Sequence, residues 1–153
     1  MTRAYVALGS NLGDRERTIR AALAELGATP GVEVAAVSQL VETEPVGYLD
    51  QPRFLNGAAA LETSLPPRAL LELLLDVERQ FGRAREGVQP QGPRTLDLDL
   101  LLYGSAQIEE PGLRIPHPRL HERRFVLEPL AELDPSLEVP GKGKIQTLLA
   151  ELH

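Results

Sequence analysis

Two aspartates at alternate positions, Asp97 and Asp99 in the run Leu96-Asp97-Leu98-Asp99-Leu100, are the residues of this sequence best suited to chemistry. Successive side chains of a strand point to opposite faces, so both carboxylates would share one face and the leucines the other. Carboxylate oxygens suit Mg²⁺, which usually completes its shell with waters and substrate phosphates. The alternative is a solvated sheet face with acidic residues at alternate positions and no bound ion.

Three arginines, Arg83, Arg85 and Arg94, lie shortly before this pair. The planar fork of a guanidinium group binds phosphate oxygens two at a time. The chain as a whole is acidic, with 22 Asp and Glu against 16 Lys and Arg and a net charge of −6. Arginines beside a carboxylate pair in such a chain indicate a site for a magnesium-bound polyphosphate.

Other segments that could bind phosphate lack a P-loop pattern. Gly141-Lys142-Gly143-Lys144 is followed by Ile145 in place of Ser or Thr, and it is interpreted as a surface turn. The run 9–13 contains no lysine and predicts a tight strand-to-helix turn, whose backbone amides could also bind an anion. His117, between Pro116 and Pro118, could be structural or functional.

A flat heterocyclic ligand is suggested by Phe54 and Asn56, which lie two positions apart and would share one face of a strand. An aromatic ring beside an amide can stack on a heterocycle and form hydrogen bonds with its edge. Phe125 is a second aromatic candidate. Either phenylalanine could instead belong to the core.

The elements that position these groups alternate between strands and helices. We expect helices after Asp14, with Ile19, Ala22, Leu23 and Leu26 on one face and Gly27 as the stop, and from Pro66-Pro67 to Phe81. The predicted strands are 4–8, 32–43, 54–63 and 96–103. This order predicts an α+β fold with a ferredoxin-like βαββαβ core, an antiparallel sheet with helices on one face. C-terminal additions follow: a short strand at 113–116, a helix at 124–133 and a helical piece at 145–152.

Length and composition limit the function classes. A chain of 153 residues predicts one domain, residues 1–153. The absence of cysteine excludes a disulfide framework, a thiolate zinc site and a cysteine nucleophile. An acidic surface disfavours nucleic acid and anionic membranes as partners. No apolar run approaches the ~18 residues of a membrane span, and no secretory signal is seen, so a cytoplasmic location is expected.

The motifs together resemble the 6-hydroxymethyl-7,8-dihydropterin pyrophosphokinase family of the folate pathway. They are, in order, Ala7-Leu8-Gly9-Ser10-Asn11-Leu12-Gly13, Phe54-Leu55-Asn56, Gly82-Arg83-x-Arg85, Gly92-Pro93-Arg94-Thr95-Leu96-Asp97-Leu98-Asp99, Ile115-Pro116-His117-Pro118 and Arg123-x-Phe125. The resemblance covers nearly the whole chain, and the motif at 92–99 is the most specific.

The resemblance implies transfer of a diphosphate from ATP to the hydroxymethyl group of the pterin, with release of AMP. Asp97 and Asp99 would hold two Mg²⁺ ions, and Arg83 and Arg94 would stabilise charge on the transferring group. The implied ATP contacts are Glu78, Arg85, His117 and Arg123. Those implied for the pterin are Thr43, Val46, Phe54, Asn56 and Phe125. The implied partners are these two small molecules, with neither nucleic acid nor membrane, and the protein is expected to be a monomer.

The sequence departs from some relatives near the nucleotide. Gln91 stands where they have a tryptophan in the segment 83–94, which the resemblance implies to be a lid over ATP. Leu75 replaces a glutamine, and Gly112 and Arg114 replace an arginine and a threonine. Two other functions stay open from the residues alone: a ferredoxin-like module that binds nucleotide or RNA without catalysis, and a kinase that transfers only the γ-phosphoryl group.

Overall fold

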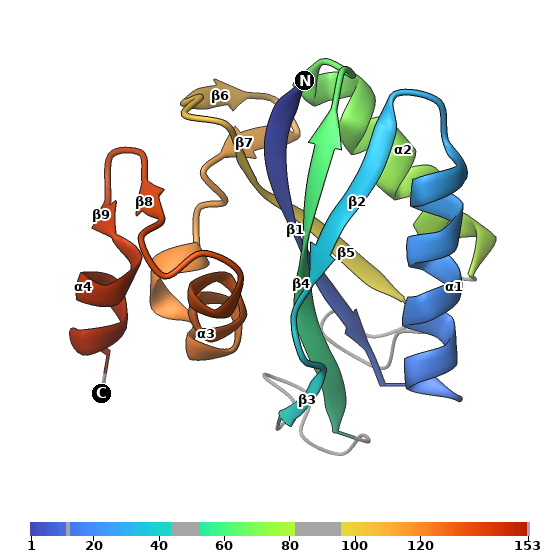
Figure 1. The fold of residues 1–153 in the computed structure, drawn as a ribbon, viewed down its shortest axis with the longest axis horizontal. Helices are drawn as coiled ribbons and strands as arrows, with labels where there is room; N and C mark the ends of the chain where they lie inside the picture. Colours follow the sequence, from blue (N-terminus) through green and yellow to red (C-terminus); the bar gives the residue numbers. More distant parts are fainter. Residues whose placement is uncertain (12, 44–52, 82–95, 153) are drawn as a thin grey trace.

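A five-stranded antiparallel sheet forms the centre of the molecule (Figure 1). The computed structural model describes residues 1–11, 13–43, 53–81 and 96–152. The main strands follow the order β2-β4-β1-β5, and β3 pairs with the end of β4. Their bounds are Thr2–Ser10 for β1, Val32–Val37 for β2, Val41–Thr43 for β3, Phe54–Thr63 for β4 and Asp97–Tyr103 for β5.

This strand order is that of the predicted ferredoxin-like βαββαβ core, which is therefore confirmed. The first strand is longer than predicted, because β1 pairs with β4 along its whole length from Thr2 to Ser10. Strand β5 pairs only with β1 among the described strands, so it forms one edge of the sheet.

The predicted second strand is interrupted. Ser38 separates β2 from β3: its backbone N–H donates to the Ala58 carbonyl, while its hydroxyl accepts from the Ala58 N–H, 2.9 Å each. The hydroxyl thus replaces the carbonyl that would continue the ladder, and the strand restarts at Val41. The single strand predicted over 32–43 was wrong at this point.

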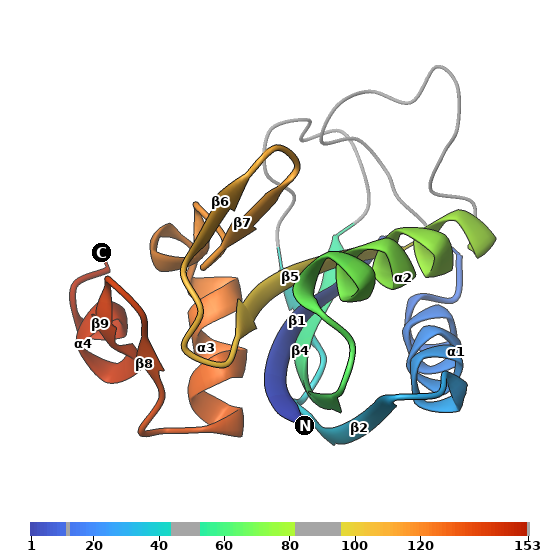
Figure 2. The same cartoon turned by 90° about the horizontal axis from the view of Figure 1, so that it is seen from above.

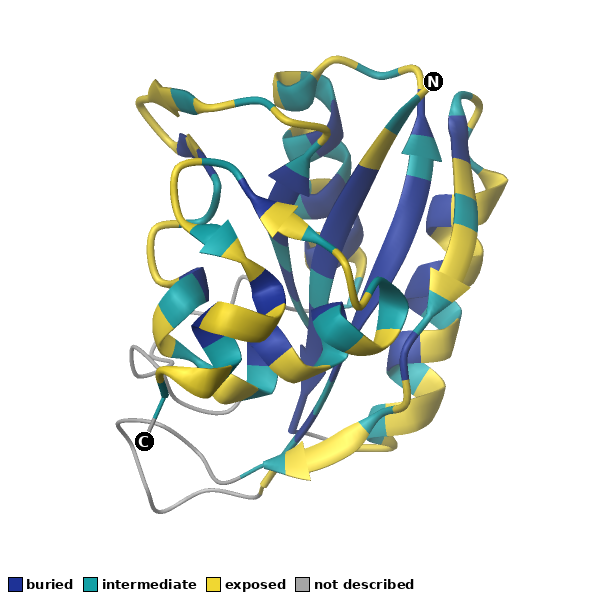
Figure 3. Ribbon diagram, turned by 60° about the vertical axis from the view of Figure 1, so that its left-hand side comes forward, coloured by how far each residue is buried: buried dark blue, intermediate teal, exposed yellow. Residues whose placement is uncertain are grey.

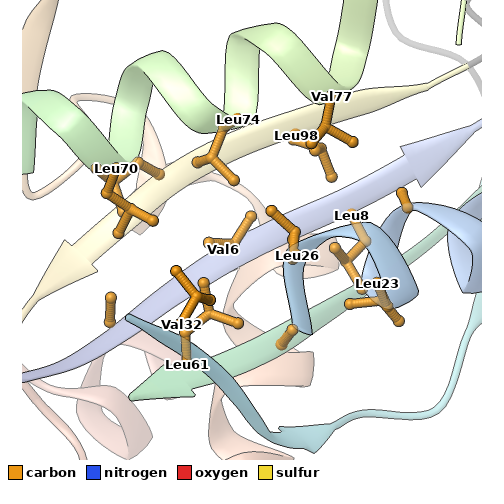
Figure 4. Packing of buried hydrophobic residues seen from close by; sticks show 14 of the residues in the cluster. Val6, Leu8, Leu23, Leu26, Val32, Leu61, Leu70, Leu74, Val77 and Leu98 are labelled. Atoms are coloured by element: carbon orange, nitrogen blue, oxygen red, sulfur yellow. The ribbon is translucent and has the colours of Figure 1, made fainter. Parts of the chain in front are cut away.

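Two helices cover one face of the sheet, α1 (Arg15–Ala28) and α2 (Pro67–Gln80). The predicted stripe of α1 is buried, and Asp14 caps its first turn by accepting from the Arg17 N–H. The predicted stop was wrong, because Gly27 lies inside the helix and Thr29 is the C-cap. Figure 4 shows the aliphatic side chains of both helices packed on the strands.

The C-terminal third covers the opposite face. Helix α3 (Arg124–Leu133), with the predicted bounds, packs on β4, and a 3₁₀ turn, η1 (Leu120–Glu122), precedes it. A second core forms there around Tyr5, Leu101 and Leu127. Figure 3 shows the buried residues concentrated in the central strands and in the inner sides of these helices.

Two small hairpins decorate this third. Strand β7 (Leu113–Ile115) is the predicted short strand, and its partner β6 (Ile108–Glu110) was not predicted. Strands β8 (Glu138–Val139) and β9 (Gly143–Lys144) form the second hairpin. Gly141 and Lys142 lie in its turn, as predicted, whereas Gly143 and Lys144 belong to β9. The last helix, α4 (Ile145–Ala150), is shorter than predicted. None of the helices described is long and apolar enough to cross a bilayer.

Candidate active site

Strand β5 carries the two aspartates at the edge of the sheet. Leu98 and Leu100 are buried, whereas Asp97 and Asp99 are partly exposed. The leucines belong to the core beneath α1 and α2, so the carboxylates point to the other face of the sheet. The alternation predicted from the sequence is confirmed, and both carboxylates share one face.

Small residues of β1 lie beside these carboxylates. Gly9 pairs with Asp97 on one side and with Asn56 on the other, and Ala7 pairs with Asp99. A Cβ atom on Gly9 would lie 3.0 Å from Asn56 Oδ1 and 3.8 Å from Asp97 Cβ. Gly9 and Ala7 therefore form a shallow floor, with an amide at one side and two carboxylates at the other.

The residues predicted to bind a heterocycle lie on the Asn56 side of this floor. Phe54 and Asn56 share one face of β4, and Thr43 of β3 is paired with Phe54. The Asn56 amide donates a hydrogen bond to the Thr43 hydroxyl. Phe125 is partly buried on α3, the helix that packs on β4, and the Arg123 guanidinium lies 5.7 Å from its ring centroid.

A cavity of about 300 Å³ lies on the other side, where α2 and the β6–β7 hairpin flank the outer edge of β5 (Figure 2). Four residues singled out from the sequence line it: Glu78, Asp97, Asp99 and His117. Three of the four positions at which the sequence departs from relatives of the implied family line it too: Leu75, Gly112 and Arg114. The structure thus brings the carboxylate pair to the wall of a cavity.

His117 is held at this wall by backbone contacts. Its N–H donates to the Leu101 carbonyl of β5 at 3.0 Å, and its Nδ1 accepts from the Arg119 N–H at 3.3 Å. The Ile115–Pro116 peptide bond just before it is cis. Burial lowers the pKa of His117 from its ordinary value of 6.5, and the positive charges of Arg123 and Arg119 act in the same direction, against Asp97. These effects favour a neutral imidazole that can form hydrogen bonds at neutral pH.

Glu78 is the most buried charged residue among those described. It lies on the last turn of α2 and is 2% exposed. Its Oε2 accepts a hydrogen bond from the Leu98 N–H at 2.7 Å, between the two aspartates in sequence. The contact joins α2 to the strand that carries the carboxylate pair.

The chain matches a known family. A family model described as 7,8-dihydro-6-hydroxymethylpterin-pyrophosphokinase (HPPK) matches residues 5–135. The chain belongs to the HPPK family. The resemblance inferred from the motifs is thereby confirmed.

Two relatives agree with this assignment. The chain is 52% identical over 135 residues to the 2-amino-4-hydroxy-6-hydroxymethyldihydropteridine pyrophosphokinase of Bacillus subtilis, which covers 88% of this chain and 80% of that one. The enzyme of the same name from Pseudomonas aeruginosa is 47% identical over 148 residues, and the alignment covers 97% of this chain and 90% of that one.

The crystal structure of wild-type Plasmodium falciparum HPPK-DHPS with pteroate shares the fold, with a TM-score of 0.74 at 14% identity. The alignment covers 98% of this chain and 42% of that one, so this chain spans less than half of its length. At this identity the likeness supports the fold alone.

The donor set of the HPPK site fits magnesium. Asp97 and Asp99 provide two carboxylates on one face at a cavity wall, and Mg²⁺ is typically bound by one or two carboxylates together with substrate phosphates and waters. Within the described ranges, no group of three or more His, Cys, Asp or Glu side chains could hold a metal ion without such help. The arrangement therefore suits an ion that arrives with a polyphosphate.

Sequence reasoning missed the floor and the contact of Glu78. Gly9 and Ala7 were noted only as part of a motif, and strand register alone places them between Asn56 and the aspartates. Four predicted site residues lie outside the described residues: Val46, Arg83, Arg85 and Arg94. So does Gln91, which stands where some relatives have a tryptophan.

Proposed function

We propose that this protein, as an HPPK, transfers the diphosphate of ATP to the hydroxymethyl group of 6-hydroxymethyl-7,8-dihydropterin and releases AMP. It is an ATP-dependent diphosphotransferase of folate biosynthesis. One observation carries the assignment to this site: Asp97 and Asp99 lie between a cavity on the outer side of β5 and the floor that leads to Asn56. The two substrates would thus meet over the carboxylate pair.

On this proposal the pterin lies at the Asn56 end. Phe54 and Phe125 would stack on its two faces, and Asn56, Thr43 and Val46 would form hydrogen bonds or contacts along its edge. The hydrogen bond from Asn56 to Thr43 supports this role, since it fixes the orientation of the amide before a ligand arrives. The floor at Gly9 would leave room for the hydroxymethyl group to reach the carboxylates.

ATP would occupy the cavity beside β5, bordered by Glu78 and His117, with Arg85 and Arg123 against its phosphates. A neutral His117 would donate or accept a hydrogen bond without repelling the nearby arginines. Arg83 and Arg94 are the proposed catalytic arginines, which would stabilise negative charge as it moves towards AMP. The segment 83–94 is the proposed lid.

Asp97 and Asp99 are the proposed ligands of two Mg²⁺ ions. Bound there, the ions would neutralise charge on the triphosphate and lower the pKa of the attacking hydroxyl. The carboxylates themselves would orient the polyphosphate relative to the floor. We also propose that the protein acts as a monomer in the cytoplasm, as one domain, with these small molecules as its only substrates.

The identity of the nucleotide product tests the proposal. Incubation with ATP, Mg²⁺ and 6-hydroxymethyl-7,8-dihydropterin should yield AMP and the pterin diphosphate in equal amounts, separated by ion-exchange chromatography. ADP in place of AMP would indicate transfer of the γ-phosphoryl group only and would refute the proposal. Tight binding of single-stranded RNA without AMP formation would favour a non-catalytic module instead.

A further inference from the structure

The edge of the sheet that carries Asp97 and Asp99 lacks a neighbouring strand among the described residues. Backbone N–H and C=O groups on the outer side of an edge strand need other partners when they are buried. The structure provides two: the Glu78 carboxylate for the Leu98 N–H, and the His117 N–H for the Leu101 carbonyl. The first of these is charged and contacts the peptide unit between the two aspartates.

The position of Glu78 is itself fixed by packing. The preceding residue Val77 and Leu74, one turn earlier, are both buried against the sheet, so this turn of α2 has little freedom to move. A charge-assisted hydrogen bond of 2.7 Å to a buried carboxylate is among the stronger contacts available to a backbone N–H. Glu78 therefore acts as a brace between a rigid helix and the strand.

A buried carboxylate beside two others is costly, since burial and like charges both disfavour it. A neutral glutamine could also accept from the Leu98 N–H. Glu78 lines the same cavity as Asp97 and Asp99, but no three such side chains in the described residues are placed to hold one metal ion together. Its oxygen instead contacts the backbone that sets the direction of both aspartate side chains.

We propose that Glu78 is a positioning residue: through the Leu98 N–H it holds the Asp97-Leu98-Asp99 segment in the geometry that binds the metal–ATP complex. This rests on the proposed function, and it assigns to Glu78 an indirect role in ATP binding. Residues that orient metal ligands typically change metal affinity by about 10- to 100-fold when they are removed.

Three substitutions separate the effect of the distance between the Glu78 oxygen and the Leu98 N–H from the effect of the Glu78 charge. Glu78→Gln keeps an acceptor oxygen at the same distance and removes the charge. Glu78→Asp keeps the charge on a side chain one methylene shorter, which withdraws the oxygen from Leu98. Glu78→Ala removes both. Glu72→Ala, on an exposed position of the same helix, is the matched control.

The first measurement is amide hydrogen exchange of Leu98 in the ligand-free protein, followed by NMR. We expect exchange at least about 10-fold faster in Glu78→Ala and Glu78→Asp, and close to the wild-type rate in Glu78→Gln and Glu72→Ala. Unchanged protection of Leu98 in Glu78→Asp would overturn the proposal. If Glu78→Ala does not fold, the Asp and Gln variants still decide it.

The second measurement is the affinity for Mn²⁺ in the presence of ATP and without pterin, by electron paramagnetic resonance. It should fall about 10-fold or more in Glu78→Asp and much less in Glu78→Gln. Equal losses in both would indicate a direct or purely electrostatic role and would overturn the proposal. Because neither measurement requires turnover, both remain interpretable even if the wild-type protein forms no AMP, the result that would refute the proposed function.

Discussion

The two faces of strands β1, β4 and β5 carry different kinds of residues on the same few peptide units. Towards α1 and α2, Leu8, Leu61 and Leu98 are buried, at 0–4% exposure. On the other face, next to Leu8 and Leu98 in sequence, Gly9 and Asp97 are paired across the strands. One face is filled by large aliphatic side chains along its length, whereas the other combines the second core around Tyr5 and Leu101 with a floor of small residues at the site.

This difference separates stability from function within single strands. The face beneath α1 and α2 is called the helix-covered face. Each leucine buried there contributes about 1.5–3 kcal/mol to the free energy of unfolding. Around the floor the site-bearing face gains little from burial, and a bound cation would lower the repulsion between its two carboxylates. Substitutions on the two faces should therefore have opposite signatures, one in stability and the other in turnover.

The largest expected effect is on the site-bearing face. Asp97→Ala or Asp99→Ala should lower the rate of AMP formation by at least about 10³-fold, because a ligand for the metal–ATP complex is lost. The melting temperature should stay close to that of the wild type, since both residues are partly exposed. Asp76→Ala, at an exposed position of α2, is the control and should keep full activity. Near-normal turnover in either site variant would contradict the metal assignment.

The reverse signature is expected for the helix-covered face. Leu61→Ala removes a fully buried side chain and should lower the free energy of unfolding by about 2–5 kcal/mol in urea denaturation. The folded fraction should retain kcat and KM, because Leu61 points away from the floor. Val41→Ala, which removes an exposed side chain, should change stability by less than about 0.5 kcal/mol. A loss of kcat larger than the loss of folded protein would show that the two faces are coupled.

Local patterns predicted the parts of this comparison that depend on periodicity. The alternation of Leu and Asp placed the carboxylates on one face, and the apolar spacing of Ile19, Ala22, Leu23 and Leu26 gave the buried side of α1. Both succeed because the period of a strand or helix is set by the backbone, whatever it packs against. The order of the motifs then identified the family. The 14 residues 82–95, which contain the proposed lid, lie outside the described structure.

Contacts between distant residues could not be predicted in this way. The break between β2 and β3 depends on the Ser38 hydroxyl reaching Ala58, 20 residues later. The brace depends on Glu78 reaching Leu98, also 20 residues away, and a glutamate at the end of an amphipathic helix looks solvent-exposed from sequence. The floor at Gly9 follows from the register of three strands, which no local pattern encodes.

A side chain added to the floor should produce a smaller, local effect. In Gly9→Ala the new Cβ would lie 3.0 Å from Asn56 Oδ1, so the amide that donates to Thr43 must move by a few tenths of an ångström. We expect KM for the pterin to rise roughly 10-fold, the equivalent of ~1.4 kcal/mol, with KM for ATP much less affected. Gly27→Ala is the matched control: its Cβ would make an ordinary 3.7 Å contact with Val34 on the helix-covered side. An unchanged pterin KM in Gly9→Ala would show that the floor does not limit access to Asn56.

The smallest expected effect is a pH dependence of the free energy of unfolding that arises from His117. The pKa of His117 lies below its ordinary 6.5 because of burial first and the charge of Arg123 second, so the unfolded chain binds the proton more tightly than the folded one. As the pH falls through 6.5 towards the lower folded-state value, the free energy of unfolding should therefore decrease, and above 6.5 this contribution should be constant. Arg123→Ala removes the second cause, so NMR titration of the His117 ring should show a higher pKa, still below 6.5 because burial remains. A pKa that falls on removing Arg123 would mean that the arginine does not act on His117 through its charge and would contradict this assignment.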